Sequence, residues 1–250
     1  MIKFSIITAT LNSEQTIKDT INSVKQQSYK SYEHIIIDSS SNNKTIKKSR
    51  SILHKRMRII KFPSRGIYKA FNKGIKLSKG KFIIFLNSDD CFYNNNVLKK
   101  LNEKINKYKF CSIFYGNLII ISKLNKIIRV WNSCNFKPEL FAKGWSPPHP
   151  SFIVKKEIYL KYGFYFQNNG DLAKDVELMV RYLGYFKLKS KYLNMITTKM
   201  RAGGISNKNI TNIIKQNIYI IKILKKYQLF EGYFHYFYNK FLIKLNEFKF

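Results

Sequence analysis

Runs of apolar residues alternate with amphipathic segments through the first half of the chain. The apolar runs lack a polar face, which is typical of strands buried on both sides of a sheet. Four of them are predicted as strands, at Lys3–Thr8, Tyr32–Asp38, Arg58–Phe62 and Lys81–Leu86. The segments between them are predicted as helices: one capped by Asn12 or Ser13, one ending near His54, and one at Gly66–Lys79.

Strands and helices thus alternate in units of about 25 to 30 residues, which predicts an α/β fold with a Rossmann-like, mostly parallel sheet flanked by helices. Ligands of such sheets bind beyond the carboxyl ends of the strands. Three of these predicted ends carry polar residues, at Thr8, at Asp38 and at Asn87–Asp90. We therefore expect the functional site at this edge of the sheet.

The second half of the chain has a less regular pattern. It predicts a β-hairpin, a proline-rich loop, a helix, a last strand and a flexible polar loop. These elements are expected at residues 111–121 and 126–131, at Ser133–Pro150, at Lys174–Gly184, at Phe186–Ile196 and at Thr197–Lys208, respectively.

From Asn209 onward the pattern is helical, with isoleucines at helical spacing among many lysines and, after Phe230, many aromatic residues. Two interpretations fit this tail equally. Its apolar residues could pack on the rest of the protein, or a basic amphipathic element could lie on an anionic membrane surface.

Composition supports the second interpretation only in part. The 250 residues carry a formal net charge of +32, which is explained either by background enrichment in lysine or by attraction to polyanions. The three cysteines form no paired or zinc-binding pattern, which favours a reducing compartment. No secretory signal and no apolar run of transmembrane length is recognisable, so we expect a cytoplasmic protein that at most lies on a membrane.

Acidic residues are scarce, at 14 against 46 Lys and Arg, yet Asp89 and Asp90 are adjacent. Paired carboxylates suit a Mg²⁺ or Mn²⁺ site, whereas Asp90 alone could cap a following helix. Their position at the end of a strand favours the metal site. Asp38 can contact a nucleotide or simply hold a turn.

Two further acids, Asp175 and Glu177, lie two residues apart in a predicted helix and so point in different directions. At most one of them is expected to reach a site, while the other could pair with Lys174 or Arg181. His149 stands between prolines and is a weak candidate for a role on the acceptor side, as is Glu177. No Walker loop, GxSxG, HExxH or GxGxxG motif is present, which argues against the commonest ATPase, hydrolase and dinucleotide sites.

Seven short motifs in order, FSIITATLN, IIIDSSSNNKT, RGIYKAFNKGI, GKFIIFLNSDD, HPSF, AKDVEL and RAGGIS, span residues 2–206. This set resembles the family-2 glycosyltransferases with the GT-A fold, in particular bacterial enzymes that build O-antigen and capsule. The resemblance implies a domain at 1–206, followed by a helical, basic and aromatic extension at 207–250. It also implies inverting transfer of a hexosyl group from a nucleotide-sugar donor to a saccharide hydroxyl, with Mg²⁺ or Mn²⁺.

Residue roles follow from the same resemblance. Asp175 matches the general base, Asp89 the metal ligand and Asp90 a supporting acid. The expected donor-binding residues are Thr8, Thr10, Asn12, Asp38, Arg65, Gly66, Tyr68, Asn72, Asn87, Ser88, Arg201, Gly203 and Gly204. The chain departs from the usual pattern where it has Asn43, Lys69 and Asn87 in place of acids.

The predicted function is therefore a metal-dependent glycosyltransferase of surface-polysaccharide (lipopolysaccharide or capsule) synthesis, with a saccharide acceptor that is expected to be lipid-linked. A non-catalytic relative that binds nucleotide sugars is the first alternative, because DSSSNNKT replaces the usual glycine-rich loop. A basic nucleic-acid-binding protein is the second, although no such module is recognisable and no nucleic-acid partner is expected.

Overall fold

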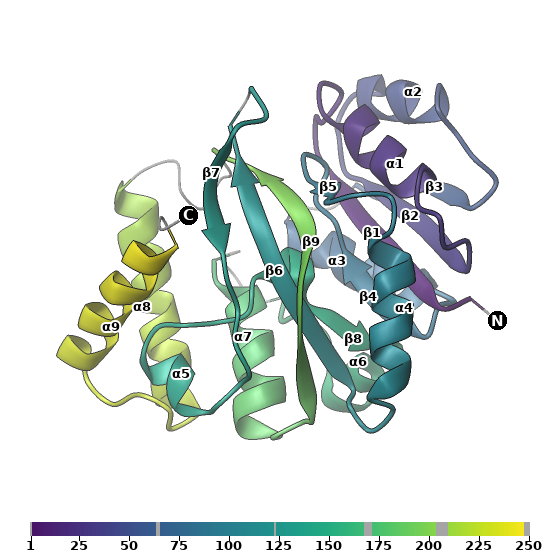
Figure 1. Cartoon of the computed structure of the whole chain (residues 1–250). Coiled ribbons are helices and arrows are strands. Elements are labelled where there is room, and N and C mark those ends of the chain that lie inside the picture. The colour runs from purple at the N-terminus through teal and green to yellow at the C-terminus, as the bar shows by residue number, and fades with distance from the viewer. Residues whose placement is uncertain (1, 64–65, 123, 168–171, 204–209, 248–250) are drawn as a thin grey trace.

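The structure, a computed structural model, describes residues 2–63, 66–122, 124–167, 172–203 and 210–247 (Figure 1). Its strands are β1 (Phe4–Thr10), β2 (Tyr32–Asp38), β3 (Met57–Lys61), β4 (Phe82–Phe85), β5 (Cys91–Phe92), β6 (Ile113–Ile121), β7 (Ile127–Trp131), β8 (Ile153–Lys155) and β9 (Ser190–Arg201). The helices before β9 are α1 (Ile17–Lys25), α2 (Lys44–Arg50), α3 (Ile67–Leu77), α4 (Val97–Lys107), α5 (Glu139–Ala142), α6 (Lys156–Tyr162) and α7 (Lys174–Met179), with a 3₁₀ turn η1 (His149–Ser151) and a π-helical segment η2 (Val180–Tyr185). Two long helices, α8 (Ile210–Lys226) and α9 (Tyr233–Asn246), follow β9.

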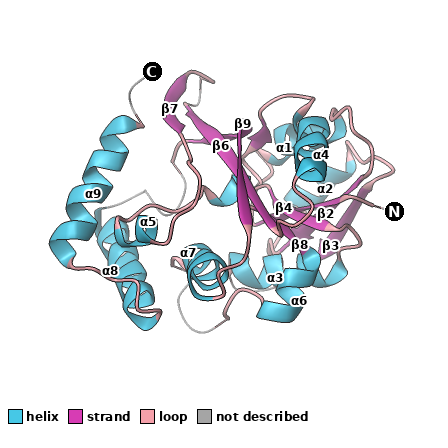
Figure 2. Cartoon of the chain, turned by 60° about the horizontal axis from the view of Figure 1, so that its bottom comes forward, coloured by secondary structure: helices cyan, strands magenta, loops and turns pink. Residues whose placement is uncertain are grey.

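The strands form one sheet in the order β3-β2-β1-β4-β8-β6-β9-β5, with β7 paired to β6. The first four strands are parallel to one another, as the sequence predicted. Antiparallel strand β8 then joins β4 to β6. Helices α1, α2 and α4 cover one face, while α3, α6 and α7 cover the other (Figure 2).

Both faces of β1, β2 and β4 are buried, which explains their unbroken apolar runs. All seven residues of β2 are buried, and β6 is buried along its whole length. Helix α1 buries Ile17, Ile21 and Val24, the stripe that the sequence predicted. The expected cap at Asn12 or Ser13 is wrong, because Thr16 precedes α1 and makes no side-chain capping bond.

The last strand is longer than its sequence indicated. Residues Thr197–Arg201, expected in a flexible loop, continue β9 alongside β6. Thr197 and Thr198 are buried there because their hydroxyls donate to the carbonyls of Asn117 and Pro150, at 3.3 Å and 3.2 Å. Hydrogen-bonded hydroxyls can thus be buried without the apolar signature on which strand prediction relies.

The predicted loop wall at Ser133–Pro150 also contains structure, namely α5 and the start of η1. The predicted helix at Lys174–Gly184 begins as expected at Lys174 and changes at Val180 into π-helical η2.

Helices α8 and α9 pack on the core through Ile220, Ile221, Leu224 and Tyr236, which belong to its largest buried cluster. Both views place the two helices at the side of the molecule opposite α1 and α2 (Figures 1 and 2). In the part of the chain that the structure describes, no helix combines the length and the apolar character needed to cross a bilayer. The division into domains at 1–206 and 207–250 stays a prediction.

The first testable prediction concerns His34, which is fully buried in β2 with its Nε2 3.0 Å from Thr8 Oγ1. Burial, aided by the nearby His54, lowers the pKa of His34 from 6.5 to about 3. The unfolded chain therefore binds a proton that the folded chain does not bind between these two values, and acidification favours unfolding. We expect His34→Gln to reduce the slope of unfolding free energy against pH by up to about 1.4 kcal/mol per pH unit within this window.

Urea denaturation between about pH 6.5 and pH 4 measures this slope. Thr8→Val is the matched control, because it removes the hydroxyl that contacts His34 but keeps the imidazole. It should lower stability and preserve the slope. Equal slopes in the wild type and His34→Gln would contradict the assignment.

Candidate active site

The carboxyl ends of β1, β2 and β4 lie side by side. Thr10 is paired with Asp38 and Ile7 with Phe85, and the amide of Leu86 donates to the Ile7 carbonyl at 3.1 Å. β1 continues beyond Ile7 to Thr10, which lies beside Asp38. The segment Asn87–Asp90 therefore begins next to this last part of β1. This register brings together the polar residues that the sequence placed at separate strand ends.

Asp38 is buried at this edge with a cation beside it. Thr10 and Ser40 both donate hydroxyl hydrogen bonds of 2.7 Å to Asp38 Oδ1, and Lys61 Nζ lies 3.0 Å from Oδ2. Lys61 also donates to the Ser40 carbonyl. Lys61 was not predicted as a site residue. In the sequence, the one feature that marks it is its position at the carboxyl end of a predicted strand.

The loop that lacks glycine, DSSSNNKT, holds the chain leaving β1. The backbone amide of Asn12 donates to Ser40 Oγ at 2.8 Å, and that of Ser13 donates to Thr45 Oγ1 at 2.9 Å. Asn12 adopts a left-handed backbone conformation (φ 51°) and is exposed. Serine and threonine hydroxyls thus shape this loop, where the usual motif would use glycine.

Ser13 also joins this loop to the acid pair, because its hydroxyl lies 2.8 Å from that of Ser88. The expected donor-binding residues Thr10, Asn12, Asp38 and Ser88 therefore form one connected group at the carboxyl edge. Their roles in donor binding stay predictions.

Asp89 and Asp90 differ in their surroundings. Asp90 is 1% exposed, and its two oxygens accept hydrogen bonds from the Asn87 side chain at 2.9 Å and from the Arg201 amide at 3.2 Å. Burial and the neighbouring Asp89 raise its pKa to about 7. The alternative of a helix cap is wrong, because Asn96 precedes α4.

Asp89 is partly buried, and no hydrogen bond to its carboxylate from another described side chain is seen. Desolvation is also the main cause that raises its pKa. A carboxylate that is desolvated and open on one side fits a hard divalent cation. Asp90 fits less well, since a cation would have to share an oxygen that already accepts a hydrogen bond.

Within the described ranges, no three His, Cys, Asp or Glu side chains converge as a metal site. Among the described residues, Asp89 is the one whose carboxylate would hold such a cation, and the cation would supply positive charge to a bound diphosphate.

Arg201 borders the acid pair from the end of β9. Its Nη2 donates to Asp19 Oδ2 at 2.6 Å, and its buried Nε has no hydrogen-bond partner among the described residues. The unpaired Nε keeps hydrogen-bonding capacity beside the acid pair, although it is buried in this conformation. Gly203, two residues on, has a positive φ of 100° and is exposed.

Asp175 lies in the first turn of α7 and contacts α3. Tyr68 donates its hydroxyl hydrogen to Asp175 Oδ1 at 3.1 Å and accepts from the Asp175 amide at 3.4 Å. Gly66, directly before α3, has a φ of 104°, a conformation that favours glycine and allows the chain to enter the helix here. The contact fixes one oxygen of Asp175 and leaves the carboxylate partly exposed.

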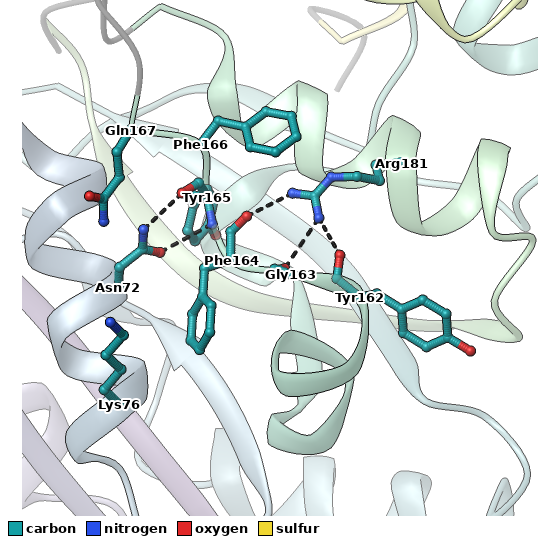
Figure 3. Close-up of a pocket in the computed structure, with 9 residues that line it drawn as sticks. All are labelled: Asn72, Lys76, Tyr162, Gly163, Phe164, Tyr165, Phe166, Gln167 and Arg181. Carbon is teal, nitrogen blue, oxygen red and sulfur yellow. Dashed lines mark hydrogen bonds between the residues drawn. The ribbon is translucent and has the colours of Figure 1, made fainter.

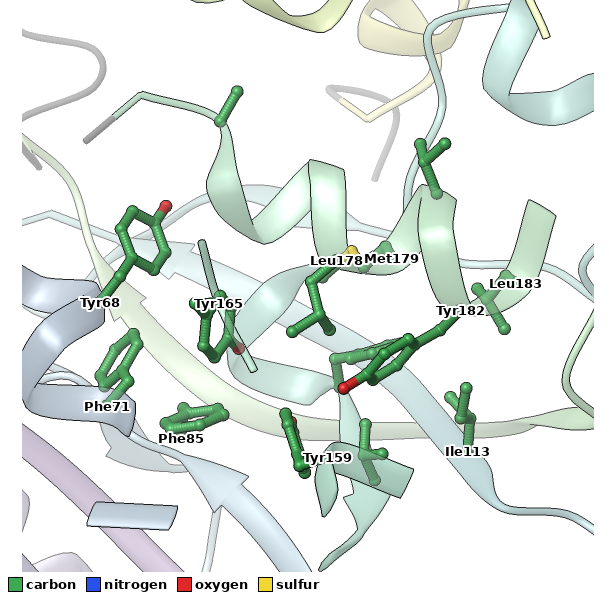
Figure 4. Packing of buried hydrophobic residues seen from close by; sticks show 14 of the residues in the cluster. Tyr68, Phe71, Phe85, Ile113, Tyr159, Tyr165, Leu178, Met179, Tyr182 and Leu183 are labelled. Carbon is green, nitrogen blue, oxygen red and sulfur yellow. The ribbon is translucent and has the colours of Figure 1, made fainter. Parts of the chain in front are cut away.

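A cluster of aromatic rings extends from Tyr68, the partner of Asp175, to Phe85 at the end of β4 (Figure 4). His149 stacks on Phe85 with ring centres 5.3 Å apart, and its Nε2 lies 2.7 Å from the Tyr165 hydroxyl. The Tyr165 ring in turn packs on Tyr68 at 5.2 Å. Burial lowers the pKa of His149 although the charge of Asp175 opposes this shift, so His149 is held in place as a neutral ring.

Glu177 makes a different set of contacts from Asp175, as expected from their spacing. Its carboxylate pairs with Arg181 at 2.9 Å and accepts from the Tyr227 hydroxyl at 2.6 Å. Arg181 uses its other donors on the carbonyls of Tyr162, Gly163 and Phe164. Glu177 therefore sits in a buried ion pair with Arg181 of η2, and the hydrogen bond from Tyr227 joins it to the residue that follows α8. Its acceptor-side role stays a prediction.

Two predicted donor-binding residues lie away from this group. Thr8 is buried against His34, and Asn72 is 2% exposed. The side-chain amide of Asn72 donates an N–H to the Tyr165 carbonyl at 2.8 Å, and its oxygen accepts from the Tyr165 backbone amide at 3.1 Å. Arg65 and Gly204 lie outside the described residues.

Asn72 also lines a hollow of about 330 Å³, together with Lys76, Arg181 and the segment Tyr162–Gln167 (Figure 3). None of the residues at the carboxyl edge lines it. The guanidinium of Arg181 is already committed to Glu177 and three carbonyls, so this hollow offers few free polar groups to a ligand.

Comparison with known proteins identifies the architecture. The family description "Glycosyl transferase family 2" matches residues 5–167. A "PGL/p-HBAD biosynthesis glycosyltransferase" of Mycobacterium tuberculosis is 24% identical over 208 residues, which cover 82% of this chain and 79% of the relative. The Escherichia coli "UDP-Glc:alpha-D-GlcNAc-diphosphoundecaprenol beta-1,3-glucosyltransferase WfgD" is 31% identical over 125 residues, 50% of this chain and 48% of WfgD.

Two solved structures share the fold. Staphylococcus aureus TarS residues 1–349 in complex with UDP-GlcNAc has a TM-score of 0.63 at 18% identity, over 90% of this chain and 71% of that one. The mannosyltransferase PcManGT of Pyrobaculum calidifontis, in complex with GDP-Man and Mn²⁺, has a TM-score of 0.65 at 13% identity, over 90% and 63%. These likenesses confirm the predicted GT-A fold.

The second testable prediction concerns the ion pair of Glu177 and Arg181. Arg181→Met leaves a buried carboxylate without its cation and removes the guanidinium donors to three carbonyls, of which that of Gly163 keeps the Tyr182 hydroxyl as a donor. We expect the free energy of unfolding to fall by about 3–5 kcal/mol. Glu157→Gln is the control. The Glu157 side chain is 69% exposed, and its substitution removes a surface ion pair in which the Lys155 Nζ lies 3.8 Å from the carboxylate. It should change stability by less than about 0.5 kcal/mol.

Urea unfolding of both variants measures the difference. A loss in Arg181→Met no larger than in Glu157→Gln would show that this ion pair does not hold α7 in place.

Proposed function

Since the chain belongs to glycosyl transferase family 2, we propose that it transfers a hexosyl group from a nucleotide-diphosphate sugar to a saccharide hydroxyl with inversion at the anomeric carbon. One observation carries the proposal. The parallel register gathers Asp38, Ser88 and Asp89 at one edge of the sheet, and the aromatic cluster connects the Tyr68–Asp175 pair to the same edge.

The nucleotide end of the donor is assigned to the group around Asp38. Lys61 lies beside this buried carboxylate and leaves part of its side chain exposed, so it adds positive charge where a nucleotide would enter. Arg201 contributes its unpartnered Nε at the acid pair. TarS and PcManGT are described in complex with a UDP-sugar and a GDP-sugar, which supports a nucleotide sugar of one of these types.

Asp89 is assigned as the residue that holds Mg²⁺ or Mn²⁺. When bound, such a cation neutralises negative charge that develops on the leaving diphosphate. PcManGT is described with Mn²⁺, which supports this choice of cation. Asp90 has a supporting role, because it accepts hydrogen bonds from the Asn87 side chain and the Arg201 backbone amide and so fixes the segment that carries Asp89.

Asp175 is assigned as the general base that accepts the proton of the attacking hydroxyl. Tyr68 occupies one oxygen of this carboxylate and fixes its orientation, so the proton is accepted at the remaining oxygen. Tyr165 packs on the Tyr68 ring and is itself held by His149, which makes both of them positioning residues.

The acceptor is proposed to be a lipid-linked saccharide in the synthesis of a surface polysaccharide such as lipopolysaccharide or capsule. The full name of WfgD describes a diphosphoundecaprenol-linked acceptor, and that of another relative, TarS, describes poly(ribitol-phosphate). We accordingly place the protein in the cytoplasm, at the inner face of the cytoplasmic membrane.

A relative that only binds nucleotide sugars is the second candidate. Its support is the altered loop after Asp38, in which Asn43 replaces an acid. Serine and threonine hydroxyls of this loop contact the chain leaving β1, so the loop keeps defined contacts at the edge without glycine. Release of nucleotide from UDP- or GDP-sugars in the presence of Mn²⁺ distinguishes the enzyme from the binding protein.

The third testable prediction concerns Asp175. Asp175→Asn retains the size and the hydrogen bond from Tyr68 but removes the basic carboxylate. We expect turnover to fall by at least about 100-fold, the lower end of what general bases contribute. The rise in melting temperature on donor binding should persist. Tyr68→Phe is the companion variant and should lose less activity, because it keeps the base and removes only the contact that orients it.

Turnover is followed as nucleotide release from the donor that gives the largest thermal shift. Unchanged turnover in Asp175→Asn would reject Asp175 as the base.

The fourth testable prediction compares Asp89→Asn with Asp90→Asn, the same chemical change at adjacent positions. Asp89→Asn should abolish the part of the donor-induced thermal shift that depends on Mn²⁺. Asp90→Asn should lower the melting temperature of the free protein, because an amide cannot accept at both of its nitrogen and oxygen positions. It should also retain a Mn²⁺ response. The reverse pattern would reassign the metal ligand to Asp90.

A further inference from the structure

Helix α9 is oriented opposite to an ordinary surface helix, with a polar stripe inward and an apolar stripe outward. The inward stripe is Tyr236, Lys240, Ile243 and Glu247, at positions i, i+4, i+7 and i+11. The outward stripe has the same spacing and consists of Phe234, Tyr238, Phe241 and Leu245, which are 83%, 53%, 60% and 46% exposed. Packing on the core therefore leaves the more apolar side of α9 uncovered.

The inward polar groups have partners that fix this orientation. Lys240 Nζ donates to Asn217 Oδ1 at 2.6 Å and to the Tyr236 hydroxyl at 2.8 Å, which ties α9 to α8. Glu247 pairs with Arg129 at 3.2 Å and accepts at its carbonyl from the Val130 amide, which ties the end of α9 to β7. Turning α9 over would bury its phenylalanines but break these contacts, so the exposed stripe belongs to the folded state.

The charge around this stripe is almost entirely positive. Residues 210–247 contain six lysines and two glutamates, and one of these, Glu247, is buried against Arg129. The other, Glu231, is exposed and lies 3.3 Å from His235. Lys222, Lys226 and Lys244 are exposed on the two helices. Helix α8 adds exposed Ile218 and Tyr219 between such lysines.

Exposed aromatic residues flanked by lysines suit one class of partner. Aromatic side chains insert at the boundary between headgroups and acyl chains, while lysines bind anionic headgroups. A second copy of this chain is a poorer partner, because it would bring together two surfaces of the same charge on molecules of net charge +32. Charge complementarity therefore selects an anionic lipid surface.

We propose that the outer face of α9, formed by Phe234, Phe237, Tyr238, Phe241 and Leu245, lies on an anionic lipid bilayer. The inference deepens the proposed function and rests on it for its biological purpose, since lipid-linked acceptors lie at such a surface. Its physical basis is independent of the reaction, and the test below contains neither donor nor acceptor.

The test measures binding of the full chain to phosphatidylglycerol–phosphatidylcholine vesicles and to phosphatidylcholine vesicles by cosedimentation. The wild type should bind the anionic vesicles and release them as salt is raised, because screening weakens the lysine contacts. Phe234→Ser with Phe241→Ser should weaken this binding by about tenfold or more. Equal binding to both vesicle types would overturn the anionic partner.

The matched control is Phe110→Ser with Leu160→Ser, two residues that are 88% and 63% exposed and lie outside α8 and α9. It removes similar exposed apolar groups and should leave vesicle binding unchanged. The lysines are tested in the same way, with Lys222→Gln and Lys244→Gln against Lys99→Gln and Lys100→Gln on α4. Both double variants lower the net charge by two. Weaker vesicle binding by the Lys222→Gln, Lys244→Gln variant alone would therefore depend on where these lysines lie and not on total charge.

Circular dichroism and melting temperature report folding of every variant, and all substituted side chains are exposed. Equal loss of binding in the α9 variant and its control would overturn the proposal. So would a shift from dimer to monomer by light scattering in Phe234→Ser with Phe241→Ser while vesicle binding stays unchanged, because the face would then join two copies of the chain. Loss of anionic-vesicle binding in the α9 variant, with the melting temperature and the control variant's binding unchanged, would support it.

Discussion

The fixed register between β1, β2 and β4 is the constraint on which the site depends. Each strand is buried on both faces, so a shift of one residue would turn every side chain to the other face and disturb both layers of helices. Because the register is fixed, Thr10 pairs with Asp38, and Asn87–Asp90 emerges beside them. The loops can therefore vary in sequence, as DSSSNNKT does, while the carboxylates stay in place.

A chain with 14 acids and 46 basic residues surrounds most of its buried carboxylates with cations. Glu33 has Arg58, Asp38 has Lys61, Glu177 has Arg181 and Glu247 has Arg129, each within 3.2 Å. Each pair compensates the cost of burying a charge and serves to join two elements. Asp89 and Asp175 differ, since neither has such a pair among the described residues, and both are partly exposed. Chemistry is thus assigned to the acids that the ion pairs leave over.

The sequence predicted those parts of the fold that depend on local pattern. The apolar runs gave β2 with its exact bounds and β1, β3 and β4 to within a few residues, because burial on both faces leaves no polar positions. Contacts between distant residues were beyond its reach. Thr197 and Thr198 looked like a loop, since only the carbonyls of Asn117 and Pro150 make them suitable for burial. Lys61, the partner of Asp38, and Tyr227, the partner of Glu177, were missed for the same reason.

The end of β9 and the tail beyond it connect the carboxyl edge of the sheet to a surface helix. Where the strand ends, Asp90 accepts the Arg201 amide and Asp19 accepts its guanidinium, so the chain leaves the sheet at a point fixed by the acid pair. Beyond it, Tyr227 of the tail reaches back to Glu177, two residues from Asp175. The helices that expose the aromatic stripe are therefore anchored to the same α7 that carries the proposed base. A surface bound by α9 would then have a defined position relative to Asp175, because rigid packing links the two.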